Sequence, residues 1–229
     1  MIIKGLQKLT LLDYPGMLAA TVFVGGCNMR CPFCHNASLV LPDRFGASIP
    51  EDEVLDFLAS RVGKLGGVCI SGGEPTLQPD LSDFIRRVRG MGFSVKLDTN
   101  GLRPDVLAAL VGEGLIDYIA MDVKNSLELY GATAGVPRLD TAPIVESIAI
   151  IRNSGLPHEF RTTLVRGLHT PKSVADIAEL IGRDPCYFLQ RFSDSGDLIS
   201  DSFGGFDDEQ IDKILAAARE RIPTVSLRG

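Results

Sequence analysis

The feature that most constrains the fold is a repeated alternation of short apolar runs with segments of helical spacing along the 229-residue chain. The apolar runs are bounded by glycine, proline or charged turns and are rich in β-branched and aromatic residues, which is typical of strands. We expect strands at residues 18–24, 67–71, 93–99, 116–123, 159–165 and 186–192. Strand–helix units in series form a parallel sheet through right-handed crossovers, so an α/β fold is predicted.

The segments between the strands carry apolar residues at intervals of three and four, as in helices that bury one face. The first expected helix follows Ser48, which stands three residues before Glu51 as in a capping box, and its apolar stripe runs from Val54 to Leu65. Further stripes lie at residues 81–88, 106–110, 144–151, 174–181 and 211–222. Both an open sheet and a curved partial barrel fit this pattern, and in both of them ligands bind at the carboxyl ends of the strands.

The domain organisation is simple, because no linker and no repeat of fixed period divides the chain. We expect one domain over residues 18–229, preceded by an arm or hairpin at residues 1–17. The net charge is −6 and the basic residues are scattered, which argues against a nucleic-acid partner. The apolar stretches fall short of the ~20 residues of a membrane span, and the N-terminus lacks the apolar segment of a signal peptide. The expected location is therefore the cytoplasm, without a membrane partner.

Three of the five cysteines lie together in the sequence GGCNMRCPFCHN, directly after the first expected strand. Thiolates this close can bind one polynuclear iron–sulfur centre, and Cys27, Cys31 and Cys34 would leave one iron without a protein ligand. An open metal position distinguishes catalytic from structural sites. Cys69 and Cys186 stand in apolar runs and are expected to be buried, inert thiols.

These cysteines allow two other arrangements. A structural zinc site could use the three cysteines and His35, but the adjacent Cys34 and His35 make a poor pair of tetrahedral ligands. A redox pair formed by Cys31 and Cys34 would leave Cys27 unexplained. The spacing therefore favours the iron–sulfur centre.

Polar segments follow the second, third and fourth expected strands, where ligands would gather. They contain Gly72, Gly73 and Glu74 in the first segment, Asp98 and Asn100 in the second, and Asp122 and Lys124 in the third. Glycines let a backbone approach a ligand closely, carboxylates accept hydrogen bonds from ammonium groups, and an Asp–Asn pair can bind vicinal hydroxyls. Each segment also has a simpler explanation, namely a capped turn, an Asn-Gly turn and a surface ion pair. Arg161, on the fifth strand, could pair with a carboxylate.

The CxxxCxxC spacing after the first strand, with Phe33 before the last cysteine, resembles the radical S-adenosylmethionine (SAM) superfamily. The resemblance covers nearly the whole chain and implies a single-domain partial (β/α)6 barrel. It also implies one [4Fe–4S] cluster on the three cysteines and reductive cleavage of SAM to a 5′-deoxyadenosyl radical. Lys124 joins the three cysteines in the catalytic group that the resemblance implies.

The resemblance also implies roles for individual side chains. Glu74 lies in the segment that binds the amino group of SAM, and Asp98 and Asn100 lie in the segment beside the ribose. Arg161 resembles the arginine that meets the SAM carboxylate, and Phe33 is placed to pack on adenine. The other expected cofactor contacts are His35, Asn36, Gly72, Gly73, Asp122, Lys124 and Gln190. Asp98 and Asp122 further resemble ligands of a monovalent cation beside the cofactor.

Three short strings point to one branch of the superfamily. These are the DYPG of the opening GLQKLTLLDYPG, the CHN that begins at Cys34, and the DxK of Asp122 and Lys124. They resemble enzymes that activate glycyl-radical enzymes, and the opening resembles in particular those that activate anaerobic ribonucleoside-triphosphate reductase. Relatives that activate pyruvate formate-lyase share the CHN and DxK strings. The implied partners are the large subunit of that reductase and, as electron donor, flavodoxin or ferredoxin. The alternatives are a pyruvate formate-lyase-type activating enzyme and a radical SAM enzyme that acts on a small molecule.

Overall fold

The computed structural model describes residues 1–184 and 186–229, which form a curved eight-stranded sheet in strand order β1 to β8. The strands are β1 (Ile3–Thr10), β2 (Ala19–Val24), β3 (Gly67–Gly72), β4 (Ser94–Thr99), β5 (Tyr118–Asp122), β6 (His158–Leu164), β7 (Tyr187–Arg191) and β8 (Ser226–Arg228). β1 pairs antiparallel with β2, and every later neighbouring pair is parallel. All six predicted strands are present, each within two residues of its expected bounds.

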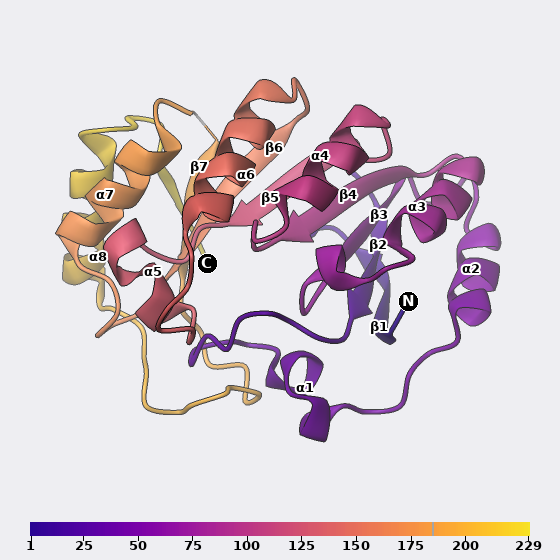
Figure 1. Cartoon of the computed structure of the whole chain (residues 1–229), viewed down its shortest axis with the longest axis horizontal. Coiled ribbons are helices and arrows are strands. Elements are labelled where there is room, and N and C mark those ends of the chain that lie inside the picture. Colours follow the sequence, from indigo (N-terminus) through magenta and orange to yellow (C-terminus); the bar gives the residue numbers. More distant parts are fainter. Residues whose placement is uncertain (185) are drawn as a thin grey trace.

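Helices follow the strands as the periodicity predicted. The α-helices are α1 (Ala37–Val40), α2 (Glu51–Ala59), α3 (Leu81–Gly90), α4 (Pro104–Gly112), α5 (Leu127–Thr133), α6 (Ala142–Asn153), α7 (Pro171–Ile181) and α8 (Asp208–Arg219), with single 3-10 turns η1 (Pro42–Arg44) and η2 (Pro75–Leu77). The larger helices lie along the outer side of the sheet, and α1 with its neighbouring loops lies across the opposite side (Figure 1). The sheet is a partial barrel, so the curved alternative is confirmed. The short elements α1, α5 and β8 were not predicted.

The capping box expected at Ser48 is wrong. α2 begins after Pro50, which leaves the Ser48 hydroxyl to accept a hydrogen bond from Lys4 Nζ at 3.0 Å. The Glu51 carboxylate instead accepts hydrogen bonds from the amino group of Met1 at 3.0 Å and from Arg87 at 2.9 Å. The helix also ends at Ala59 rather than continuing to Leu65. Long-range ion pairs therefore replace the local cap.

The segment before β2 closes the amino end of the barrel. After β1 the chain turns under the sheet, where the Tyr14 side chain is buried and packs against Gly67 at the start of β3. A Cβ atom on Gly67 would lie 2.8 Å from the Tyr14 ring, so this contact depends on glycine. Asp13 accepts a hydrogen bond from the Thr21 hydroxyl at 2.6 Å and faces the barrel interior. No helix in the described ranges is long and apolar enough to cross a membrane.

Candidate active site

The cysteine loop connects β2 to α1 at the carboxyl end of the sheet. It is held as a compact turn by hydrogen bonds from Cys34 N to Cys31 O at 3.0 Å and from Met29 N to Cys27 Sγ at 3.4 Å. Burial raises the pKa of Cys27 to about 11 and that of Cys31 to about 12, and it also raises the pKa of Cys34. The free thiols are therefore neutral at pH 7, and a metal must displace their protons to bind.

The three cysteines form a donor set that fits the predicted iron–sulfur cluster. All three thiols line one cavity, and the Lys124 charge acts on each of them to favour the thiolate. Within residues 1–184 and 186–229, no three His, Cys, Asp or Glu side chains are grouped as ligands of one metal ion. Three thiols on one cavity wall are the ligand set that the predicted cluster requires.

A segment distant in sequence braces the cysteine loop. Residues 195–200, which we call the strap, lie between β7 and α8 and bond to the loop and the start of α1. The hydrogen bonds are Ser195 Oγ to His35 O (2.9 Å), Ala37 N to Asp197 O (3.0 Å), Ser38 N to Asp197 Oδ2 (2.9 Å) and Ser200 N to Pro32 O (2.8 Å). On another side Arg30 N donates to Ala134 O at 2.8 Å. The loop is thus supported by two separate segments from the second half of the chain.

Gly72 and Gly73 allow the end of β3 to touch this loop. A Cβ atom on Gly73 would lie 2.0 Å from Gly26 O, and one on Gly72 would lie 2.5 Å from Val24 N. Gly72 also has a φ of +116°, in the region that favours glycine. Both glycines line the cavity, so the close approach by a ligand that the sequence predicts stays a prediction. The structure shows that they permit a close approach between two segments of the chain itself.

Glu74 is buried and combines two of the roles that its sequence context suggested. Its carboxylate accepts hydrogen bonds from Thr76 N (3.1 Å), Thr76 Oγ1 (2.6 Å), Thr99 Oγ1 (2.8 Å) and Asn100 N (2.7 Å). Burial raises the pKa of Glu74, while these hydrogen bonds oppose that rise. Three of the four donors bond to Oε1, so Oε2 retains the capacity to accept from an ammonium group. Glu74 therefore caps η2 and also faces the cavity.

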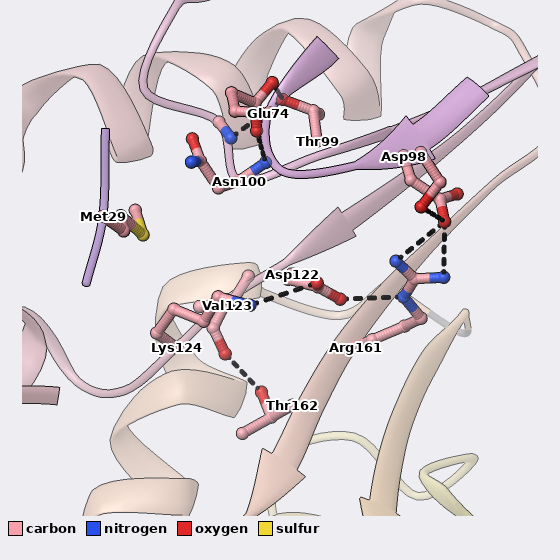
Figure 2. Close-up of polar contacts among 12 residues, drawn as sticks. Met29, Glu74, Asp98, Thr99, Asn100, Asp122, Val123, Lys124, Arg161 and Thr162 are labelled. Carbon is pink, nitrogen blue, oxygen red and sulfur yellow. Dashed lines mark hydrogen bonds and ion pairs between the residues drawn. The ribbon is translucent and has the colours of Figure 1, made fainter. Parts of the chain in front are cut away.

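A wall of alternating charges lies opposite Glu74 (Figure 2). Arg161 on β6 stands between two carboxylates, with Nε at 2.8 Å from Asp122 Oδ1 and an Nη at 3.4 Å from Asp98 Oδ2. A third carboxylate, Glu159, lies 3.6 Å from Arg161. Lys124 Nζ is 3.1 Å from the second oxygen of Asp122.

These contacts fix the charge states of the wall. Burial raises the pKa of Asp122, but the charges of Arg161 and Lys124 outweigh it and hold the pKa well below its ordinary value. Burial by itself would lower the pKa of Lys124, but Asp122, Cys31 and Tyr130 together raise it above its ordinary value. The wall therefore keeps its charges across the physiological pH range. The interaction expected between Asp122 and Lys124 is present, but it lies in the barrel interior rather than on the surface.

One cavity of about 430 Å³ brings together all of the predicted site residues. They are Cys27, Cys31, Phe33, Cys34, His35, Asn36, Gly72, Gly73, Glu74, Asp98, Asn100, Asp122, Lys124, Arg161 and Gln190. Its size suits a small organic ligand. The sequence interpretation missed Asp13, Met29 and Val40, which also line the cavity. Met29 lies inside the cysteine motif and could have been found there, whereas Asp13 reaches the cavity only because the chain folds under the barrel. The expected monovalent cation stays a prediction, since Asp98 and Asp122 already contact side-chain cations.

The model of the family described as "Radical SAM superfamily" matches residues 21–181, which include the cysteine loop and the charged wall. The chain belongs to the radical SAM superfamily. Enzymes of this superfamily use a [4Fe–4S] cluster and SAM, and this chain is therefore a radical SAM enzyme. Its three cysteines line the cavity.

Individual relatives of this radical SAM enzyme agree with the assignment. It is 34% identical over 197 residues to a protein of Methanocaldococcus jannaschii named as a candidate glycyl-radical enzyme activating enzyme, covering 83% of this chain and 80% of the relative. It is 34% identical over 134 residues to the pyruvate formate-lyase-activating enzyme of Clostridium pasteurianum, covering 54% of this chain and 52% of that enzyme. The crystal structure of a radical SAM methyltransferase from Sphaerobacter thermophilus has the same fold, with a TM-score of 0.70 and 22% identity over 96% of this chain and 68% of that one.

Proposed function

We propose that this radical SAM enzyme installs a glycyl radical on a partner enzyme, and that the partner is the large subunit of an anaerobic ribonucleoside-triphosphate reductase. The observation that carries the proposal is the similarity to a candidate glycyl-radical enzyme activating enzyme over 83% of the chain. The GLQKLTLLDYPG opening supports the choice of reductase, because it resembles activating enzymes of that type, whereas the CHN and DxK strings resemble activating enzymes of glycyl-radical enzymes more generally. The reaction would take place in the cytoplasm, with flavodoxin or ferredoxin as the electron donor.

Different residues of the cavity would bind the cluster and SAM. Cys27, Cys31 and Cys34 would hold the cluster, and Glu74 would accept a hydrogen bond from the amino group of SAM through its less occupied oxygen. When bound, the cluster and SAM supply the one-electron chemistry that removes a hydrogen atom from a glycine Cα. The buried charges of the wall orient the bound molecule without taking up or losing protons.

A protein substrate needs access at the carboxyl end of the sheet. The sheet is not closed, since β1 and β8 are the two ends of the strand order and are not paired to each other. Closed eight-stranded barrels fill their interior with side chains, whereas this partial barrel keeps a cavity there. A flexible glycine loop of a partner could enter more readily than a folded domain.

Electron paramagnetic resonance tests the proposal directly. Reconstituted enzyme, a chemical reductant, SAM and the reductase large subunit should together give an organic radical with a doublet split by the single remaining α-hydrogen. Reductase labelled with α-deuterated glycine should lose that splitting, and the Cys31→Ala enzyme should give no radical.

The same experiment separates the alternatives. A radical that forms on pyruvate formate-lyase but not on the reductase would move the proposal to the second kind of activating enzyme. Other relatives are named as GTP 3′,8-cyclases and 7-carboxy-7-deazaguanine synthases, so a small-molecule substrate is the rival class. Cleavage of SAM with conversion of an added nucleotide, and no protein radical with either partner, would contradict the proposed function.

A further inference from the structure

Lys96 is a fully buried lysine in the barrel interior. It has no role in the reaction proposed above. It lies on β4, two residues before Asp98, so both side chains point to the same face of the strand. Lys96 is only 1% exposed, and it is among the largest fully buried side chains of the described residues. It does not line the cavity, so it can act on a ligand only through its neighbours.

Lys96 has one close charged partner, the Asp98 carboxylate. Nζ lies 2.5 Å from Asp98 Oδ1, while Cys69 Sγ is 3.9 Å away and the centre of the Tyr118 ring 5.8 Å away. A buried ammonium costs several kcal/mol of solvation unless a charged partner offsets the loss. If packing alone mattered at this position, an apolar side chain of similar length would fill it at lower cost.

The distances around Asp98 show what the Lys96 charge does. Asp98 Oδ1 is taken by Lys96, and Oδ2 accepts from the Ser71 hydroxyl at 3.0 Å. Arg161 lies farther from Asp98, at 3.4 Å, than from Asp122, at 2.8 Å. Lys96 is thus the cation nearest to Asp98, and Arg161, whose charge also acts on Asp98, sits closer to Asp122.

The charge balance of the wall depends on the pairing of Lys96 with Asp98 and of Arg161 with Asp122. Three cations, Lys96, Lys124 and Arg161, face three carboxylates, Asp98, Asp122 and Glu159. Arg228 on β8 pairs with Glu159 from outside this set, at 2.7 Å. Without Lys96, Arg161 at 3.4 Å would be the cation left beside Asp98, and Asp98 would attract it away from Asp122.

We propose that Lys96 is a positioning residue, which neutralises Asp98 from within the barrel and thereby keeps Arg161 seated against Asp122 in the cavity wall. Lys96 is then required for SAM binding although it does not reach the cavity. Because the chain's membership of the superfamily implies SAM, this inference holds whichever partner protein or small molecule is the substrate.

Calorimetry with SAM on anaerobically reconstituted protein tests this role, together with iron content and thermal unfolding. Lys96→Met should keep the iron but lose about tenfold or more in SAM affinity, since a displaced charge-assisted contact is worth about 1.5–3 kcal/mol. Lys96→Arg restores the charge and should bind SAM within about threefold of the wild type. Lys64→Met, at an exposed lysine, is the control and should change nothing.

Two results would overturn the proposal. One is wild-type SAM affinity in Lys96→Met. The other is an equal loss in Lys96→Met and Lys96→Arg, which would mean that the shape of the side chain matters and its charge does not. If Lys96→Met fails to fold, Lys96→Gln decides the question, because it keeps a hydrogen-bond donor near Asp98 without the charge and should still bind SAM more weakly than Lys96→Arg. The test contains no partner protein, so a failed activation of the reductase leaves its outcome unaffected.

Discussion

The cysteines of this chain have two different environments, although all of their thiols have raised pKa values. Cys27, Cys31 and Cys34 face the cavity, whereas Cys69 is fully buried within the sheet and Cys186 is only partly buried. Single replacement of Cys27, Cys31 or Cys34 by alanine should abolish the cluster, because each removes one of three protein ligands. Iron and sulfide analysis after anaerobic reconstitution should give about four of each per wild-type chain and almost none in these variants.

Cys69→Ala and Cys186→Ala are the matched controls, and both should bind the full complement of iron. Zinc as the only metal after anaerobic reconstitution would contradict the assignment of the site.

Glu74 offers a second test at the scale of one residue. Glu74→Gln keeps the shape of the side chain but removes the charge, so it should weaken SAM binding by about tenfold, the value of one charge-assisted hydrogen bond. The cluster should remain, because Glu74 is not one of its ligands. Calorimetry with SAM measures the effect, and Glu113→Gln, at an exposed glutamate near the end of α4, is the control. Equal affinities in wild type and Glu74→Gln would remove Glu74 from the SAM site.

At the scale of the elements, the contact between β3 and the cysteine loop depends on a missing side chain. Gly73→Ala would place a Cβ atom 2.0 Å from Gly26 O, and backbone cannot yield as a flexible side chain can. We expect a melting temperature lower by roughly 5 °C or more and reduced iron uptake, as for a substitution that costs about 2 kcal/mol.

The matched control for Gly73→Ala is Gly112→Ala, which lies within α4 with open space around its Cβ position. It should leave the protein as stable as the wild type or slightly more stable, since alanine is favoured over glycine inside helices by about 1 kcal/mol. Thermal unfolding of both variants makes the comparison, and equal melting temperatures would show that the close approach does not matter.

Periodicity predicted the strands well but could not say which face of a strand points inward. In β4, Val95 and Leu97 alternate with Lys96 and Asp98, and the usual expectation places the apolar pair in the core and the charges in solvent. The sheet of a partial barrel is buried on both faces, so the apolar pair packs under the helices and the charged pair enters the interior. The spacing of the cysteines identified the cluster ligands directly, whereas Lys96 could have been connected with the site only through the alternation that puts it on the same strand face as Asp98.

At the scale of the whole molecule, the strap joins the last third of the chain to the cysteine loop. Its hydrogen bonds end on residues 32–38, so loss of the cluster should loosen both segments together. Removal of iron by a chelator should make chymotrypsin cleave after Leu198 at least about fivefold faster, because local opening exposes the backbone to the protease.

Cleavage after Leu12 provides the internal reference for that experiment. Leu12 is 89% exposed in the turn at the other end of the barrel, and its cleavage rate should not depend on iron. Mass spectrometry of the fragments distinguishes the two sites. Equal acceleration at both would indicate global unfolding instead of a local link between cluster and strap.

The strap also bears on when the protein can acquire its iron in the cell. During translation the three cysteines are synthesised early. The strap residues that bond to the cysteine loop follow about 160 positions later, which is the separation of Ser195 from His35. Until that stretch has been synthesised, the cysteine loop and the start of α1 lack the four hydrogen bonds that the strap makes with them. We therefore expect the assembly machinery to deliver iron and sulfide to the finished polypeptide and not to the nascent one.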